Sequence, residues 1–541
     1  MYKITVKIIC NYLFFPISNS AVKSKVWVET EDKKPYDIDL RLCASAEYVT
    51  WMYTGAKKGE KIVFSCEKEG IVDLIYQGNV LPQDLFNEEL RPYFHFTPAR
   101  GWVNDPNGLV YVNGKYHVFY QHNPYDVRWG NMHWGHSYSD DMFSWKDAGE
   151  ALYPDENGTM FSGCAVYDKN NESGLGKNDL PPVLLYYTSA GGDNSASAGK
   201  PFTVCMAYSV DGGQTYVKYG ENPVVPNIVY GNRDPKIIRF EKENKWIMIL
   251  FLRGNDFAIL SSGNLLVWKK ESVITLPTMN ECPDLFPIYG TDKWAILAGA
   301  DFWGNKSVGK YVIGVFDGHE FIIENGPYPI DFGKEFYSLQ TFYNDPKERR
   351  VLMGWRTKNF FMPDNDGMPF NGEYSVPTSL TPCYINGELR LARYPVEEFF
   401  ELEGEILYSE EKTCYDAALV DAHVFDISAG RSFFAEISFV PENNLIMELN
   451  VAGEKIVYNL ETQTLQCFDK NVKVPPENGD INLLVLRDVS SIELYAQNGK
   501  YPITGYFVPR GEGVKLNFYR GKAENFICKI KSVSDLFGKR K

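Results

Sequence analysis

The segment Tyr138-Ser139-Asp140-Asp141-Met142-Phe143-Ser144-Trp145 has two relatives further along the chain. Tyr208 to Tyr216 (YSVDGGQTY) and, more loosely, Leu260 to Trp268 (LSSGNLLVW) repeat its order: a strand that ends in Ser, a polar turn, and an aromatic residue that opens the next strand. Recurrence of one strand–turn–aromatic unit is typical of radially repeated sheets and favours a β-propeller. A β-sandwich also produces such repeats, so the repeat alone leaves both architectures open.

Short alternating runs dominate the chain after residue 90, where helical periodicity is nearly absent. Turn signals such as Asn113-Gly114 separate these runs, as expected for strands joined by tight turns. The sequence therefore predicts an all-β protein. Its clearest predicted strands are 116–120, 183–187, 246–250 and 294–297.

Changes in the sequence pattern divide the chain into three parts. Residues 91–395 carry the repeats and are predicted to form the propeller. From about residue 396 an acidic stretch, Glu397 to Glu411, leads into a β-meander, which predicts a separate C-terminal β-sandwich over 396–541. Residues 25–90 are predicted to form a small N-terminal β-module, with 61–66 as one of its strands.

The N-terminus allows two interpretations. Lys3 and Lys7 precede an apolar stretch from Ile8 to Ile17, and the small residues Ser18-Asn19-Ser20 follow. Residues 1–20 therefore resemble a short, imperfect signal peptide, which predicts an extracytoplasmic (periplasmic or secreted) protein. The alternative is an ordinary first strand. No other segment is apolar for the ~20 residues that a membrane helix requires, so no membrane span is predicted.

Bulk properties exclude several function classes. The 541 residues are enough for two to four domains. A net charge of −15 argues against a nucleic-acid partner, because phosphate binding needs a basic face. Ten scattered Cys do not form a disulfide scaffold. His133-x-x-His136 lies in an alternating strand pattern that would place the two rings on opposite faces, so no metal site is predicted. The sequence alone leaves the oligomeric state open.

Three acids share an unusual setting beside proline. They lie in Trp102 to Gly108 (WVNDPNG), in Arg233-Asp234-Pro235 and in Glu281-Cys282-Pro283-Asp284. Proline fixes its own φ and extends the residue before it, so each acid is expected at a strand end or turn, held in one direction. By contrast, Asn344-Asp345-Pro346 runs into a charged stretch and is predicted to be an ordinary turn. In a chain with 15% aromatic residues, positioned carboxylates suggest carbohydrate chemistry.

These motifs resemble those of the glycoside hydrolase family 32 fructosidases, which are invertases, inulinases and levanases. The resemblance spans about residues 92–535, and residues 25–90 resemble an N-terminal β-module of some gut-bacterial members. It implies a five-bladed propeller followed by a β-sandwich. Two positions depart from the family pattern: Cys164 stands where Ser is common, and Glu335 where Asp is frequent. The motifs that carry the resemblance are 102–108, 121–124, 129–136, 161–163, 233–235, 281–284, 336–337, 353–355 and 486–495.

The resemblance also implies catalytic roles. Asp105 becomes the nucleophile, Glu281 the acid/base and Asp234 the stabiliser of the transition state. We expect adjacent Arg233 to keep Asp234 ionised, and burial with nearby carboxylates to raise the pKa of Glu281. A retaining pair should have its carboxyl groups about 5–5.5 Å apart. No cofactor is required, because acid–base chemistry on an acetal needs none.

By the same resemblance, seven residues line the subsite for fructose. Amide, hydroxyl and guanidinium groups match a polyol, and aromatic faces match its C–H surface. They are Asn104, Gln121, Trp129, Phe161, Ser162, Arg233 and Trp355.

Four functions remain open at this point. The favoured one is an exo-acting, retaining β-fructosidase that releases terminal β-D-fructofuranose from levan, inulin or sucrose. An endo-levanase, a fructosyltransferase and a non-catalytic fructan-binding protein are the alternatives. The presence of all three acids disfavours the last. Linkage preference and the role of the N-terminal module are not determined.

Overall fold

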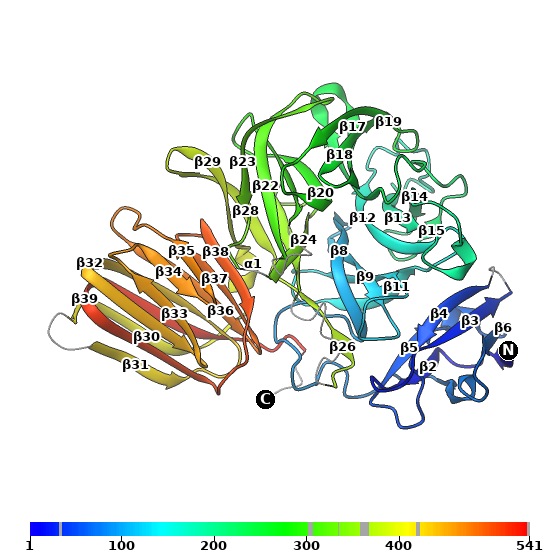
Figure 1. Cartoon of the computed structure of the whole chain (residues 1–541), viewed down its shortest axis with the longest axis horizontal. Helices are drawn as coiled ribbons and strands as arrows, with labels where there is room; N and C mark the ends of the chain where they lie inside the picture. Colours follow the sequence, from blue (N-terminus) through cyan, green and yellow to red (C-terminus); the bar gives the residue numbers. More distant parts are fainter. Residues whose placement is uncertain (32–34, 301–306, 334, 358–366, 418–421, 538–541) are drawn as a thin grey trace.

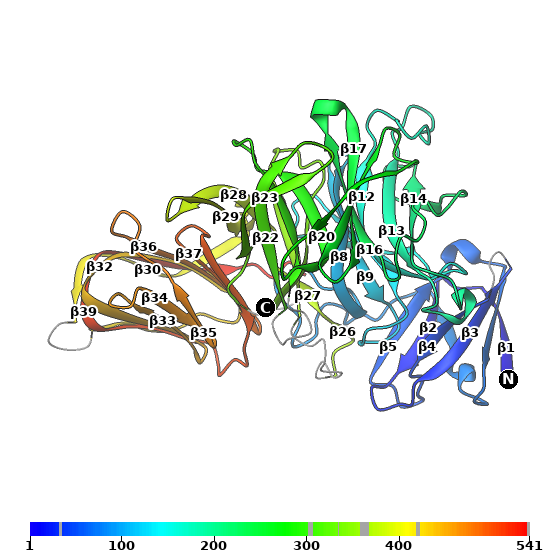
Figure 2. The ribbon, with the colours of Figure 1, turned by 45° about the horizontal axis from the view of Figure 1, so that its top comes forward.

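The computed structural model describes residues 1–31, 35–300, 307–333, 335–357, 367–417 and 422–537. Three β-rich units follow one another: an N-terminal module, a propeller and a C-terminal sandwich (Figure 1). The module and the sandwich lie at opposite ends of the propeller (Figure 2). In the described part of the chain, no helix is long and apolar enough to cross a membrane. The predicted all-β architecture of propeller plus sandwich is confirmed.

The N-terminal module consists of two small sheets packed face to face. Apolar side chains at alternate strand positions, such as Val26, Val28 and Phe64, point between them and are fully buried. One sheet has the order β1 (Tyr2–Lys7), β6 (Lys61–Cys66), β3 (Ser24–Thr30), β4 (Tyr36–Leu40), and the other β5 (Tyr48–Tyr53), β2 (Tyr12–Ile17), β7 (Tyr76–Gly78).

Residues 1–20 belong to this module, which corrects the signal-peptide interpretation. β1 pairs with β6, and β2 lies between β5 and β7. Leu13, Phe15 and Ile17 are fully buried in the module's core. The apolar stretch that imitated a signal peptide is therefore the central strand of a sheet, and the first-strand alternative is the one the structure supports.

Five sheets arranged as blades form the propeller. The predicted strands 116–120, 183–187, 246–250 and 294–297 all lie within its strands. The first two blades are β8 (Gly101–Val112), β9 (Lys115–Asn123), β10 (His133–Ser139), β11 (Lys146–Leu152), and β12 (Thr159–Tyr167), β13 (Val183–Ala190), β14 (Thr203–Ser209), β15 (Val217–Lys218). The third is β16 (Arg233–Phe240), β17 (Lys245–Arg253), β18 (Asp256–Ser262), β19 (Lys269–Thr275). The last two are β20 (Asn280–Pro287), β21 (Trp294–Ala300), β22 (Ser307–Phe316), β23 (Phe321–Pro329), and β24 (Glu335–Thr341), β25 (Val351–Arg356), β28 (Thr378–Ile385), β29 (Glu388–Pro395).

The first strands of the five blades surround the propeller axis. β8, β12, β16, β20 and β24 contact one another in this order, and β24 returns to β8. The short strand β26 (Phe370–Asn371) also pairs with β8 and ties the end of the ring to its beginning. Residues far apart in sequence therefore meet at one axis.

The repeated segment that predicted the propeller forms the same turn in three successive blades. In each case the turn joins the third strand of a blade to the fourth. The Ser139 hydroxyl lies 2.7 Å from an Asp141 carboxylate oxygen, and Ser209 lies 2.6 Å from Asp211. In the looser third copy, Ser262 lies 3.2 Å from Asn264. The repeat is thus a side-chain-stabilised turn.

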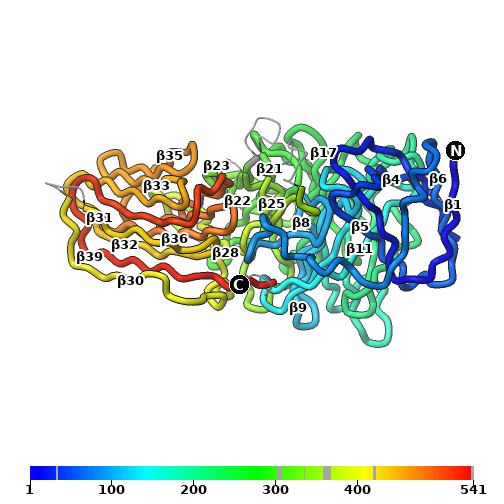
Figure 3. The backbone as a smooth tube through the Cα atoms, turned by 90° about the horizontal axis from the view of Figure 1, so that it is seen from below, coloured from blue at the N-terminus to red at the C-terminus, as the bar shows by residue number. Residues whose placement is uncertain are grey.

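The C-terminal sandwich is a ten-stranded antiparallel sheet that folds over on itself. Its long strands β32 and β39 pair with each other through several register shifts, which let them bend across the fold. Its strands are β30 (Glu403–Asp416), β31 (Ala422–Ser428), β32 (Phe433–Val451), β33 (Glu454–Asn459), β34 (Thr464–Cys467), β35 (Lys470–Lys473), β36 (Ile481–Asp488), β37 (Ser491–Ala496), β38 (Tyr501–Tyr506) and β39 (Gly513–Val533). After β39 the chain returns to the propeller (Figure 3), where the Leu536 N–H bonds the Tyr93 carbonyl.

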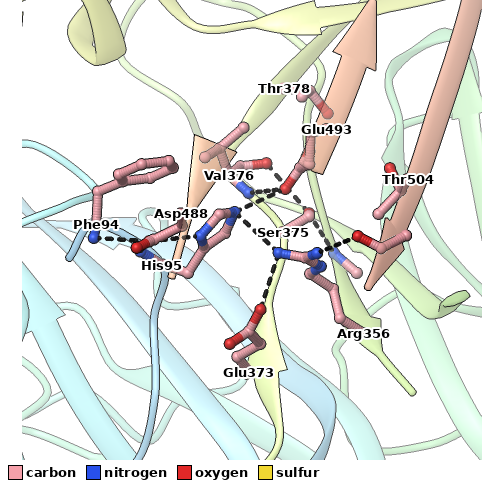
Figure 4. Close-up of polar contacts among 12 residues, drawn as sticks. Phe94, His95, Arg356, Glu373, Ser375, Val376, Thr378, Asp488, Glu493 and Thr504 are labelled. Carbon is pink, nitrogen blue, oxygen red and sulfur yellow. Dashed lines mark hydrogen bonds and ion pairs between the residues drawn. The ribbon is translucent and has the colours of Figure 1, made fainter. Parts of the chain in front are cut away.

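A buried network of charges joins the propeller to the sandwich (Figure 4). The His95 ring lies 2.9 Å from both Asp488 and Glu493, which come from the sandwich. Two carboxylate partners outweigh burial and raise the pKa of His95 to about 9. Nearby, Arg356 of β25 forms an ion pair with Glu373 at 2.8 Å. The imidazolium therefore holds the two domains together.

Candidate active site

Each of the five inner strands is irregular within its first few residues. A register shift there places extra residues opposite the neighbouring strand, as in a β-bulge, and turns side chains out of the regular alternation. The shifts lie between residues 103 and 106 in β8, 161 and 163 in β12, 233 and 236 in β16, 280 and 284 in β20, and 337 and 340 in β24. Every one of the three motif acids lies inside such a shift.

Four residues of these irregular segments have left-handed backbone conformations. The φ angles are 61° for Asp234, 51° for Glu281, 46° for Cys282 and 49° for Ser338. Residues with a Cβ rarely adopt this region, and such strain gathers at functional sites. The segments are therefore shaped to aim particular side chains rather than to extend the sheets.

Asp105 is held by hydrogen-bond donors from three blades. Ser162 of β12 and Ser338 of β24 each donate to one of its carboxylate oxygens at 2.6 Å, and the Asn104 amide donates at 3.0 Å. The Trp102 indole fixes that amide by donating to it at 2.9 Å. Burial raises the pKa of Asp105, and these donors oppose the rise. The carboxylate is thus fixed in orientation.

Cys282 connects two of the carboxylates. Its sulfur lies 3.5 Å from Asp105 Oδ2 and 3.7 Å from Asp234 Oδ2, and its main-chain N–H donates to Asp234 at 3.1 Å. Burial and the neighbouring carboxylates raise the thiol's pKa well above its usual value. The thiol therefore stays protonated and serves as a donor between Asp105 and Asp234.

The pKa of Asp234 is raised to about 7, which corrects the expectation that Arg233 keeps it ionised. Burial is the largest cause, and repulsion from Glu281 and Asp105 adds to it. Arg233 opposes the rise, but its Nε is 3.7 Å from Asp234 while its terminal nitrogen donates to Glu281. The guanidinium is therefore shared between two acids.

Glu281 has two partners, one at each carboxylate oxygen. Arg233 donates to one carboxylate oxygen, and the Tyr337 hydroxyl donates to the other at 2.8 Å. The three acids thus form one connected cluster, with Cys282 between Asp105 and Asp234 and Arg233 between Asp234 and Glu281.

The cluster lies in a cavity of about 380 Å³ at the propeller axis. The structure brings together all ten residues that the sequence pointed to: Asn104, Asp105, Gln121, Trp129, Phe161, Ser162, Arg233, Asp234, Glu281 and Trp355 all line it. A lining that combines acids with aromatic rings suits a ligand with hydroxyl groups and an apolar C–H face.

Four further residues line the cavity that sequence reasoning did not select as site residues: Phe202, Cys282, Tyr337 and Ser338. Cys282 and Tyr337 lie inside quoted motifs, so the signal was present but not used. The two departures from the family pattern are not among the lining residues. Cys164 is buried in the propeller core, and Glu335 accepts a hydrogen bond from the Tyr506 N–H of the sandwich at 2.7 Å.

Comparisons with known proteins identify relatives of the chain. A levanase of Bacillus subtilis is 31% identical over 512 residues, which cover 86% of this chain and 72% of that protein. An extracellular exo-inulinase of Aspergillus ficuum is 28% identical over 79% of this chain and 91% of its own length. Three other curated relatives are matched over only 33%, 50% and 54% of their length.

The solved structure of a glycoside hydrolase family 32 protein from Bifidobacterium adolescentis shares the fold over 99% of this chain and all of its own. Its TM-score is 0.69 at 19% identity. The model of the glycosyl hydrolases family 32 N-terminal domain matches residues 95–389, which include all the lining residues of the cavity. The chain therefore belongs to glycoside hydrolase family 32.

Proposed function

We propose that this glycoside hydrolase is a retaining, exo-acting β-fructosidase that releases terminal β-D-fructofuranose from levan or inulin, and from sucrose. The observation that carries the proposal is the connected cluster of Asp105, Asp234 and Glu281 inside one cavity. Two relatives named levanase and exo-inulinase support the class of substrate. The cavity of about 380 Å³ has room for a terminal sugar, as exo action requires.

In the proposed mechanism Asp105 attacks the anomeric C2 of the terminal fructose. Glu281 gives its proton to the leaving oxygen, so a covalent fructosyl-enzyme forms and the remaining sugar departs. Glu281 then takes a proton from water, whose oxygen attacks C2 and releases Asp105. Two displacements at C2 retain its configuration.

Asp234 acts on the sugar in the transition state of each displacement. Positive charge develops on C2 and the ring oxygen in the transition state, and it favours the ionised form of a nearby carboxyl group. A pKa of about 7 therefore makes the ionisation of Asp234 responsive to a positive charge on the sugar. As an acceptor for ring hydroxyl groups, it binds the sugar more tightly as this charge grows.

A product profile over time on levan, inulin and sucrose tests the proposal. Fructose alone from the first minutes supports exo-hydrolysis and ranks the linkages. Short oligosaccharides appearing first indicate an endo-levanase, larger products indicate fructosyl transfer, and no product from any of the three indicates a binding protein.

Variants assign the roles. Asp105→Ala should lose nearly all turnover while folding normally. Glu281→Ala should keep activity only on substrates with good leaving groups, because those need little protonation. Equal losses on good and poor leaving groups would contradict the role of Glu281 as the acid.

We further propose that the protein acts outside the cytoplasm, where polymeric fructans are accessible. The name of the extracellular Aspergillus relative supports this location. Detection of the protein and its activity in the culture medium or periplasm, with a cytoplasmic marker absent, is the direct test.

A further inference from the structure

Two of the aromatic residues that line the cavity lie on loops at the border with the N-terminal module. Trp129, which is 45% exposed, belongs to the Trp129 loop (residues 124–132) between β9 and β10. Phe202 ends the Phe202 loop (residues 191–202) between β13 and β14. Both rings contact Phe161 edge-on, with centroids 6.0 and 5.5 Å away. The three rings form one side of the cavity.

The Trp129 loop is attached to the module on both sides of the tryptophan. Before it, Tyr125 and Val127 are buried in the module's own core, and Asp126 pairs with Arg41 at 2.9 Å. After it, the Asn131 amide bonds the main chain of Asp39 twice, accepting at 2.8 Å and donating at 2.9 Å. The propeller supplies further contacts: Asn123 at the end of β9 accepts from the Asn131 amide at 3.1 Å and donates to the Arg128 carbonyl at 2.7 Å.

The Phe202 loop is attached through a second contact with the same module. Asp37 of β4 accepts a hydrogen bond from the Ser195 N–H at 2.7 Å. Asp37 is 8% exposed and also bonds Lys25, so its carboxylate is fixed on the module. Ser195 opens a short 3₁₀ turn, which the Asn194 side chain caps by accepting from the Ser197 N–H at 2.8 Å. β4 therefore contacts both loops. Figure 1 shows β3 and β4 beside the second blade, which contains β13 and β14.

We propose that the N-terminal module is a positioning element for the substrate cavity: through Asp37, Asp39 and Arg41 it holds the loops that carry Trp129 and Phe202. This inference rests on the proposed function, since it concerns how that cavity binds sugar. An exposed tryptophan on a nine-residue loop has many conformations available, and holding it in one lowers the entropy lost on binding. The module thus strengthens substrate binding without touching the substrate.

Two variants remove contacts with the module, and Asn131→Gly also removes the hydrogen bond from the Asn131 amide to Asn123 of β9. Asn131→Gly deletes the amide but tolerates the left-handed φ of 43° at this position, and Asp37→Ala deletes the acceptor for Ser195. We expect the double variant to raise KM for both sucrose and inulin about five- to twenty-fold and to change kcat less than about two-fold, because uniform binding is lost. Hydrogen exchange should become faster in residues 124–132 and 191–202.

Asp39→Asn is the matched control. It changes the side chain that pairs with Lys23 on the module surface but leaves the main-chain contact with Asn131. Its KM and its exchange in both loops should equal those of the wild type. If Asp37→Ala fails to fold, Asn131→Gly alone should give faster exchange in the Trp129 loop and part of the rise in KM.

Three results would overturn the proposal. The first is unchanged exchange in both loops of the folded variants. The second is faster exchange with an unchanged KM. The third is a rise in KM for inulin with none for sucrose, which would make the module a polymer-binding surface. A wild-type protein inactive on every fructoside would instead refute the proposed function, and the exchange data would still report whether the module holds the loops.

Discussion

At the scale of single residues, the buried acid cluster lowers the free energy of unfolding at neutral pH. Asp234 is buried close to two other carboxyl groups, and its pKa is raised to about 7 from the usual 3.8. The folded protein therefore binds this proton more tightly than the unfolded chain does. Stability due to this group is highest below about pH 4 and is lost as pH rises to about 7.

Asp234→Asn should accordingly stabilise the protein while abolishing turnover. A neutral amide avoids the cost of ionising a buried carboxyl group, so we expect the free energy of unfolding at pH 7.5 to rise by about 1–3 kcal/mol. The gain should disappear at pH 4, where the wild-type group is protonated. Urea unfolding at both pH values measures it. Asp292→Asn, at a side chain that is 84% exposed, is the control. An equal gain in stability for Asp234→Asn at both pH values would show that the gain does not come from ionisation of Asp234.

Proline close to an acid located the three cavity acids only together with an Arg, Cys or aromatic neighbour, since Asp345 beside Pro346 lies outside the cavity. Asp105, Asp234 and Glu281 meet in one cavity, as the motifs predicted. The sequence could not reveal that Ser338 donates to Asp105, because the two are 233 positions apart and only the closed ring joins them. The sequence also misled about Asp234: adjacency to Arg233 suggested a dominant attraction, whereas burial decides the pKa.

At the scale of the strand, the irregular start of each inner strand positions the site. In β12 the register shift depends on Gly163, where a Cβ would lie 1.9 Å from the Tyr186 carbonyl oxygen. That oxygen belongs to the main chain of the neighbouring strand and cannot move aside. Only glycine therefore lets Ser162 turn towards Asp105.

Gly163→Ala should destabilise the protein by about 3 kcal/mol or more, because the clash forces the two strands apart. Molecules that still fold should have lost most of their kcat, since the Ser162 donor moves away from Asp105. Thermal unfolding and steady-state kinetics check both effects. Gly220→Ala, whose Cβ would meet no atom within 4 Å, should leave both unchanged. Wild-type stability in Gly163→Ala would refute the proposed role of glycine.

Most strands were predictable from alternation, but their irregularities and the structure of residues 12–17, which form β2, were not. Alternating runs correctly located β9, β13, β17 and β21. Residues 12–17 lack that alternation, because the central strand of the module is buried on both faces. A short, fully apolar run looks the same in a buried strand and in a signal peptide.

At the scale of the whole molecule, the His95 network couples the domains in a pH-dependent way. The pKa of His95 is raised to about 9, so its contribution is complete below about pH 6.5 and lost as pH rises through 9. The pKa of Glu493 is lowered to about 2, so its contribution is present above about 4.5 and lost as pH falls towards 2. The link between propeller and sandwich is therefore strongest between these limits.

His95→Gln should lower the free energy of unfolding by about 3–5 kcal/mol at pH 6, because Asp488 and Glu493 lose the charge that compensates them. The difference from the wild type should shrink by pH 10, where the wild-type imidazole is neutral. Calorimetry at the two pH values measures it. His319→Gln, at a half-exposed surface histidine, is the control. A difference that does not depend on pH would show that His95 contributes packing rather than charge.

The closed ring of inner strands has a further consequence for the timing of activity during synthesis. Asp105, Asp234 and Glu281 come from the first, third and fourth blades, and the fifth supplies Ser338. A nascent chain that has emerged only as far as the third blade contains Asp105 and Asp234 but not Glu281. The ring also cannot close until β24 meets β8 and the 370–371 segment pairs beside it. The site is therefore incomplete until the fifth blade has left the ribosome. An unfinished polypeptide should not hydrolyse the sugars of the cell that makes it.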